Sequence, residues 1–240
     1  MGIKERKERE KEQRRADIIS SARAAFVKYG IEHTTMDRIA AEAELSKGTL
    51  YLYYRNRDEL LMSIMGEDLE HLSNRIADVA TKPWTASRRL LASFGTFYDY
   101  SLQNEFMYRM MTQVNIRSLF ETDNTCEPVC HFRDVNTRIM ALVTSILDDG
   151  VNAGEFIVSQ PLQHVVVQMM VAMKGAMVML RNEMLPPAWL TQSQAETLHS
   201  IACLFVRGLS SPTALPLCNN LFGDPARPLS NETSLPQDKS

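Results

Sequence analysis

Apolar residues recur along most of the chain at intervals of three and four, which is the period of a helix with one buried face. The first clear case begins at Ala16 and ends before Gly30, a residue typical of helix C-termini. Its apolar face consists of Ile18, Ala22, Ala25, Phe26 and Tyr29. No stretch bounded by Gly or Pro alternates polar and apolar residues for long enough to indicate a strand. The pattern therefore predicts an all-α protein.

Two short helices joined by a tight turn come next. Thr34 and Thr35 offer an N-cap for a helix over residues 36–43. Ser46 offers an N-cap for a helix over residues 46–53, which carries small and hydroxylated side chains in its first turn and ends in aromatic residues. A slim first turn of this kind is typical of a helix that enters the DNA major groove with its N-terminal end.

Longer helices follow. Asn56 is expected to cap a helix over residues 57–79, and the other amphipathic stretches predict helices over residues 86–112, 131–153, 160–184 and 191–209. Residues 210–240 contain five of the ten prolines and predict a disordered tail. The expected organisation is a charged arm, a compact three-helix unit, a larger helical region and the tail, over residues 1–15, 16–62, 63–209 and 210–240.

Composition makes this an ordinary globular chain, with 45% hydrophobic and 23% charged residues among 240. No apolar run is expected to reach the roughly 18–20 residues that cross a bilayer, and the N-terminus is too charged for a signal peptide. We therefore expect a cytoplasmic protein without a membrane partner. The four cysteines are too few and too scattered to indicate a disulfide-stapled secreted fold.

Charge is distributed unevenly around the net value of −3. Residues 1–60 carry 13 Lys+Arg and 11 Asp+Glu, or +2, and the remainder carries 13 and 18, or −5. A weakly basic head on an acidic body suits contact with phosphate at one end only. The charged run over residues 4–15 has two interpretations, a solvated helical extension or a basic arm that uses Lys11, Arg14 and Arg15 on DNA.

Three linked motifs carry a family resemblance. They are Thr35-x-x-x-Ile39-Ala40, then Ser46-Lys47-Gly48-Thr49-Leu50-Tyr51, then Tyr54-x-Asn56-Arg57-x-Glu59-Leu60-Leu61. Together they resemble the TetR family of bacterial transcriptional regulators. The resemblance implies a helix-turn-helix domain over residues 16–62 and a helical ligand-binding and dimerisation domain over residues 63–209. It also implies a dimeric repressor that a small ligand releases from a pseudo-palindromic operator.

One position departs from the family pattern. Most members carry Gly in the turn between the two short helices, whereas this chain has Glu44. A residue with a side chain takes the left-handed conformation at a cost of about 1–2 kcal/mol. We expect a local penalty in stability rather than a different fold.

The predicted DNA contacts follow from the short helix and its flanks. Gly48 permits close approach of the backbone to DNA, and the other residues of the set listed below have side chains that can reach bases or phosphates. Leu50 and Tyr54 are not in the set, because they share the inner face of the helix. Ser46 could serve only as an N-cap, and the two arginines could be solvated surface. By resemblance, Thr35 contacts phosphate as well. The full set is Thr35, Ser46, Lys47, Gly48, Thr49, Tyr51, Tyr53, Arg55 and Arg57.

Methionine and aromatic residues gather in the second region and suit an adaptable apolar ligand pocket, although ordinary core packing explains any single one as well. The candidates are Phe94, Phe97, Tyr98, Met107, Met110, Met111, Met140, Met169, Met173 and Met177. The last two long helices suit a four-helix homodimer interface. Its expected apolar face consists of Val165, Val166, Met169, Ala172, Ala176, Leu198, Ile201, Ala202 and Phe205.

The sequence also bears on two other classes of function, a metal or redox sensor and an enzyme. The group Cys126-x-x-x-Cys130-His131 leaves open a regulator that senses metal or oxidation, although a closed zinc site usually needs four ligands. No Gly-rich phosphate loop, zinc-protease motif or nucleophile motif is present, so no enzyme is expected. The leading interpretation includes no metal and no cofactor. The effector, the operator sequence and the choice between repressor and activator cannot be derived from the sequence.

Overall fold

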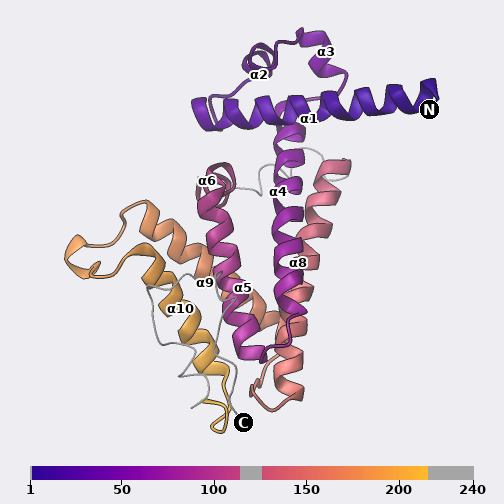
Figure 1. The fold of residues 1–240 in the computed structure, drawn as a ribbon. Helices are drawn as coiled ribbons and strands as arrows, with labels where there is room; N and C mark the ends of the chain where they lie inside the picture. The colour runs from indigo at the N-terminus through magenta and orange to yellow at the C-terminus, as the bar shows by residue number, and fades with distance from the viewer. Residues whose placement is uncertain (1, 114–125, 216–240) are drawn as a thin grey trace, which may run out of the picture. The chain divides into compact units, whose positions relative to one another are not determined.

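The computed structural model describes residues 2–113 and 126–215, and the side chains of residues 3 and 111–113 lie outside the description. In that part of the chain every regular element is helical, and the backbone pairs as β-structure only at the single bridge between Phe156 and Ser210 (Figure 1). The all-α prediction is confirmed. The elements are α1 (Ile3–Tyr29), α2 (Met36–Glu42), α3 (Lys47–Tyr51), α4 (Arg57–Ala80), α5 (Ala86–Gln103), α6 (Glu105–Gln113), α8 (Glu127–Asn152), α9 (Leu162–Arg181), the 3-10 turn η1 (Pro187–Trp189) and α10 (Gln194–Leu209).

The helices form two compact units. The first contains the described residues up to 70 together with residues 105–110 and 126–135. The second contains residues 71–104, 111–113 and 136–215. Helices α4, α6 and α8 therefore each contribute residues to both units. The predicted domain boundary at residues 62–63 falls inside α4, and it stays a prediction.

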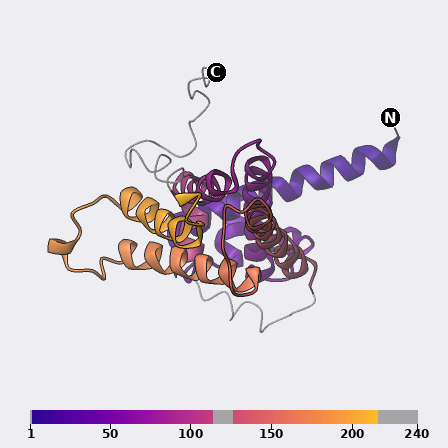
Figure 2. The ribbon, with the colours of Figure 1, turned by 90° about the horizontal axis from the view of Figure 1, so that it is seen from below.

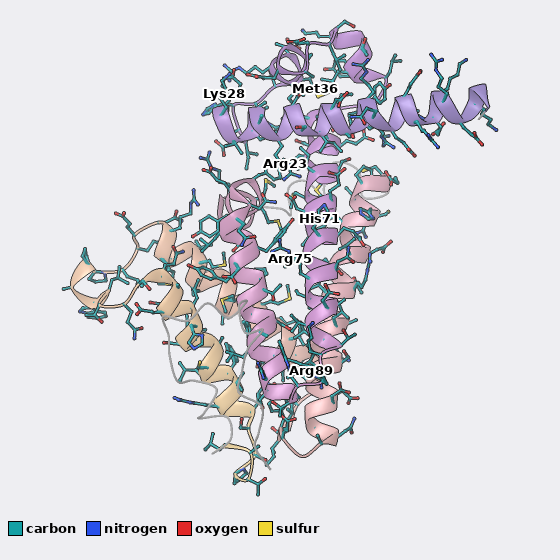
Figure 3. All side chains as sticks on the ribbon, viewed as in Figure 1. Arg23, Lys28, Met36, His71, Arg75 and Arg89 are labelled. Atoms are coloured by element: carbon teal, nitrogen blue, oxygen red, sulfur yellow. The ribbon has the colours of Figure 1, made fainter. Side chains whose placement is uncertain are left out.

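In the first unit, α2 and α3 lie on one side of α1 (Figure 1). Met36 points from α2 toward α1 and is buried (Figure 3). The loop before α2 is fixed by Thr34, which is also buried, because its hydroxyl donates to the carbonyls of Ala25 and Gly30 at 3.2 and 2.7 Å. Thr35 rather than Thr34 therefore caps α2, and its hydroxyl accepts from the amide of Arg38.

Helix α1 is longer than the sequence pattern predicted. The helix was expected to begin at Ala16, but it begins at Ile3 and includes nearly all of the predicted charged arm. The apolar period stops at Ile18, whereas the helix continues because Lys, Arg, Glu and Gln are strong helix formers. Pairs at four-residue spacing support it, such as Arg6 with Glu10 at 2.8 Å and Gln13 with Asp17 at 2.9 Å.

Other boundaries also differ from the prediction. The helix expected over residues 86–112 is two helices, because Asn104 adopts φ −118° and ψ 89° and interrupts the helical backbone. Helix α8 begins at Glu127 rather than at residue 131, since Pro128 is tolerated in a first turn. Helices α9 and α10 are shorter than predicted, at Leu162–Arg181 and Gln194–Leu209.

The second unit is held together by contacts between helices and loops. The carboxylate of Glu155 accepts from the amides of Ala86 and Ser87 at 2.9 and 3.0 Å and so caps α5. Ser211 donates its amide to the Glu155 carbonyl at 2.7 Å and its hydroxyl to the Gly154 carbonyl at 2.7 Å. The prediction of disorder from residue 210 is therefore wrong for residues 210–215, and residues 216–240 lie outside the described residues.

Helix α9 corrects the expectation that no apolar run is long enough to span a bilayer. Leu162–Arg181 has 20 residues and meets the length and composition of a membrane span. The core helix of a soluble protein can pass the same test. Five of its residues, Val165, Val166, Met169, Met173 and Met177, are buried within the chain.

Candidate nucleic-acid interface

The short helix α3 is held at both ends. Ser46 caps it, with its hydroxyl accepting from the Thr49 amide at 3.1 Å. Glu44 supplies the left-handed turn with φ 52°, as predicted. Leu50 and Tyr54 are buried beneath the helix, and burial raises the pKa of the Tyr54 hydroxyl. These supports fix the direction in which the remaining side chains of α3 project.

Helix α3 carries four of the nine predicted contacts. Lys47 and Gly48 are exposed, Tyr51 is 50% exposed, and Thr49 is half-buried. The sequence interpretation missed Leu52, which is 84% exposed at the end of the helix. The sequence contained a signal for it, because Leu52 is the leucine of residues 46–53 that does not lie on the inner face of the helix.

Gly48 has no structural role that a larger residue could not fill. Its backbone does not take a positive φ, and a Cβ placed there would meet only the Ser46 hydroxyl, at 3.9 Å, among the described residues. Packing within the chain therefore does not require glycine at this position. The absence of a side chain leaves the backbone of the first turn open to close approach from outside.

Lys47 is already held by a neighbour. Its ammonium forms an ion pair with Asp37 in the first turn of α2, and both side chains are more than half exposed. Thr35 is exposed just before α2, next to the amides of that first turn. The starts of α2 and α3 thus present one lysine, one carboxylate and two hydroxyl-capped helix N-termini to solvent.

The other predicted contacts are less free. Tyr53 is half-buried. Arg57 hydrogen-bonds the Ile31 carbonyl at 3.3 Å and pairs with Asp58 at 2.9 Å, and Arg55 pairs with Glu59 at 3.4 Å. The predicted phosphate contact of each arginine therefore requires the side chain to leave or share its partner.

Two polar clusters anchor the helices behind the interface. On α2, the hydrogen bond from Lys28 lowers the pKa of the Glu42 carboxyl, which also accepts from the Tyr29 hydroxyl at 2.7 Å. On the side of α1 facing away from α2 and α3, Arg23 pairs with Asp68 at 2.6 Å (Figure 3). The start of α6 also packs on α1, where the rings of Phe26 and Phe106 lie 5.9 Å apart.

The predicted ligand-pocket residues are not all in one unit. Met107 and Met110 are buried in the first unit, and the side chain of Met111 lies outside the description. The second unit contains the other candidates. Phe94, Phe97, Tyr98 and Met140 are half-buried, and Met169, Met173 and Met177 are buried. Phe94 of α5 stacks on Phe205 of α10 at 6.4 Å, so aromatic and methionine side chains line the interior of this unit.

The predicted dimer face needs correction. Val165, Val166, Met169, Leu198 and Ala202 are buried within their own chain, so these side chains are not available to a second copy. The hydrophobic period identified the inner faces of α9 and α10, which pack against each other. The apolar side chains that α9 and α10 expose instead are Val167, Met170, Val171, Met179 and Leu204.

The cysteine and histidine group does not form a cluster. Cys126 is buried, Cys130 is exposed, and both thiols are free. His131 packs on Gly66 and lies 4.0 Å from Glu70. Within residues 2–113 and 126–215 no group of three or more His, Cys, Asp or Glu side chains is placed to hold a metal ion.

Residues 18–64 match the sequence profile described as bacterial regulatory proteins of the tetR family. The fatty acid metabolism regulator protein of Bacillus subtilis is 22% identical over 138 residues, which is 58% of this chain and 68% of that protein. The profile match covers α2 and α3 and reaches into α1 and α4, so it contains the predicted contact residues.

Two solved structures share the fold over most of the chain. The transcriptional regulator FadR from Bacillus subtilis, in complex with stearoyl-CoA, has a TM-score of 0.62 at 17% identity and covers 81% of this chain and 98% of its own. RolR in complex with resorcinol has a TM-score of 0.62 at 18% identity, covering 95% and 98%. At these identities the likeness concerns the fold.

Proposed function

Because the chain belongs to the TetR family of bacterial transcriptional regulators, we propose that it is a homodimeric repressor of the cytoplasm. In this proposal α3 of each subunit enters the major groove of one half of a pseudo-palindromic operator. A small, largely apolar ligand binds in the helical region and releases the operator. In this proposal residues 16–62 bind DNA, and residues 63–209 bind the ligand and form the dimer. No enzymatic activity is proposed.

The observation that carries the DNA-binding role is Gly48. No described neighbour needs its small size, and its backbone conformation does not need glycine. It lies between the exposed Lys47 and Thr49 in the first turn of α3. A base pair or phosphate that approaches this turn closely explains why a side chain is absent there.

Gly48→Ala is therefore expected to separate folding from DNA binding. The variant should be as stable as the natural chain or more stable by up to about 1 kcal/mol, because alanine favours helix. Its operator affinity should fall by about 1–3 kcal/mol for each half-site, because the new methyl group obstructs the groove contact. Urea unfolding and fluorescence anisotropy measure the two quantities. Full affinity in a folded variant would remove Gly48 from the interface.

The experiment that tests the function begins with the natural protein. A random-sequence duplex library is enriched for bound DNA, and the selected sequence is examined for two half-sites about 34–36 Å apart, or one helical turn. The complex is then challenged with stearoyl-CoA and with resorcinol, the ligands of the two structures above. Release by the acyl-CoA supports an apolar effector, and failure to enrich any sequence contradicts the DNA-binding role.

The ligand proposal draws on the interior of the second unit. Methionines of α9 and the stacked rings of α5 and α10 are polarisable and change rotamer easily, which suits an apolar guest. One relative is named for fatty acid metabolism and one structure of the same fold contains stearoyl-CoA, which makes an acyl chain the first candidate. Helix α4 follows the contact helices directly and leads into the ligand region, so we propose it as a route for coupling between them. Helix α6 is proposed as a second route, because its start packs on α1 through Phe106 and its end belongs to the second unit.

We assign the dimer contact to the exposed sides of α9 and α10. Val171 is 67% exposed, and Leu204 on α10 is 67% exposed as well. Val171→Glu is expected to turn the dimer into single chains, because a carboxylate buried in an apolar contact costs several kcal/mol. Light scattering measures the mass. Ser145→Glu, on an exposed position of α8, is the matched control; an unchanged dimer in both variants would exclude this face.

A further inference from the structure

The N-terminal half of α1 is a helix without a core to pack on. Residues 4–15 are all charged except Gln13, and none is apolar. In Figure 1 this stretch extends beyond α2 and α3 toward the N-terminus, and Figure 2 shows it projecting clear of the other helices of its unit. Burial therefore does not explain the position of this segment.

The charges are sorted around the helix. At 3.6 residues per turn, Lys4, Lys7, Lys11, Arg14 and Arg15 fall within a sector about 100° wide. The carboxylates of Glu5, Glu8, Glu10 and Glu12 all fall outside that sector, as do Arg6 and Arg9. We call the five residues in the sector the basic stripe.

Members of the basic stripe differ from the other cations of this segment in their contacts. Arg6 is neutralised by Glu10 at 2.8 Å. Lys4, Lys7, Lys11 and Arg14 are exposed, and none has a hydrogen bond or ion pair to another described residue. The segment therefore keeps an uncompensated row of positive charge in an otherwise balanced run.

The stripe also has a defined direction. It continues the same face of α1 that buries Ile18 and Ala22 against the first unit. Its last member, Arg15, lies 5.8 Å from the ring centre of Tyr54, directly after α3. The basic stripe thus begins beside Tyr54 and runs toward the N-terminus along the face of α1 that contains Ile18 and Ala22.

We propose that the basic stripe binds the phosphate backbone of double-stranded DNA flanking the operator half-site, an inference that rests on the proposed function. The row from Lys4 to Arg15 is about 16 Å long, which corresponds to up to about five base pairs beyond the helix-turn-helix footprint. Binding is independent of base sequence, because phosphates carry none of it. A membrane surface does not fit, since the segment has no apolar face.

The test compares two variants that lose the same charge. Lys7→Gln with Lys11→Gln removes two members of the stripe, and Arg6→Gln with Arg9→Gln removes two cations outside it. Each is titrated onto a long duplex and onto one trimmed to the half-sites, both carrying the sequence that the natural protein selects. Far-UV circular dichroism checks that the helix is kept, as expected because Gln is a good helix former.

The stripe variant is expected to lose salt dependence on the long duplex only. Four phosphate contacts in a dimer lower the slope of log affinity against log salt by up to about 3.6, equivalent to about 100-fold between 50 and 200 mM. The Arg6 and Arg9 variant should keep the natural slope. Equal slopes for the two variants, or a stripe effect that persists on the trimmed duplex, would overturn the inference. Loss of selective binding by the natural protein would instead contradict the proposed function.

Discussion

Arg23→Ala is expected to lower the free energy of unfolding by about 3 kcal/mol. The carboxylate of Asp68 is only 3% exposed, and the guanidinium of Arg23 lies 2.6 Å from it. Removing the arginine leaves a buried charge without its partner, which costs about 3–5 kcal/mol in other proteins. The low end applies here because the Arg23 side chain is 29% exposed, so water reaches part of the gap. Urea unfolding at one protein concentration measures the change.

Two controls separate this pair from ordinary surface charge. Arg6→Ala breaks an ion pair whose side chains are 79% and 61% exposed, and it should change stability by less than about 0.5 kcal/mol. Asp68→Asn combined with Arg23→Ala should recover at least half of the loss, because the buried charge is gone. If the double variant is as unstable as Arg23→Ala alone, the loss comes from packing, for example from the contact of Arg23 with the Phe106 ring at 5.2 Å.

Local signals in the sequence were sufficient for the helix-turn-helix. Ser46, Thr35 and Asn56 each cap the helix that they precede, because a capping hydroxyl or amide depends only on residues two or three positions away. The inner positions Leu50 and Tyr54 follow from a spacing of four. Once the cap and the inner positions are known, the remaining residues of the first turn of α3 are the ones left facing outward, and the predicted contact set contains them.

Contacts between segments far apart in the sequence could not be predicted from the hydrophobic periodicity. Arg23 and Asp68 are 45 residues apart, and nothing near either residue specifies the other. The sequence does indicate that Asp68 is buried, because it continues the spacing of the buried Leu61 and Ile64 on α4. It gives no such indication for Arg23. Likewise, Glu155 caps α5 from 69 residues away.

The predicted dimer face was wrong for five of its nine residues for a different reason. A hydrophobic period finds the face that is buried, but it does not distinguish burial within one chain from burial between two chains. Helix α9 is apolar nearly all round, so its inner residues, such as Val165, gave the stronger period. Val167 and Val171 could be identified as exposed only from the structure, in which α10 packs against the inner face of α9.

Lys47→Ala and Asp37→Asn are expected to change operator affinity in opposite directions. Lys47 stands at the start of α3 and pairs with Asp37 at the start of α2. If the ammonium reaches DNA, its loss weakens binding by about 1–3 kcal/mol for each half-site. Asp37→Asn removes a negative charge from the same surface and frees the lysine, so affinity should rise by up to about 1 kcal/mol for each half-site.

The sign of the Asp37→Asn effect distinguishes two roles for Lys47. A lysine that only holds α3 against α2 would make both variants bind more weakly, because each breaks the same ion pair. A lysine that contacts the operator makes them diverge, and the divergence shrinks at high salt as phosphate and carboxylate are both screened. Both side chains are more than half exposed, so neither variant should change the unfolding free energy by more than about 1 kcal/mol. Anisotropy titrations at two salt concentrations decide between the roles, and parallel losses would remove Lys47 from the DNA contact.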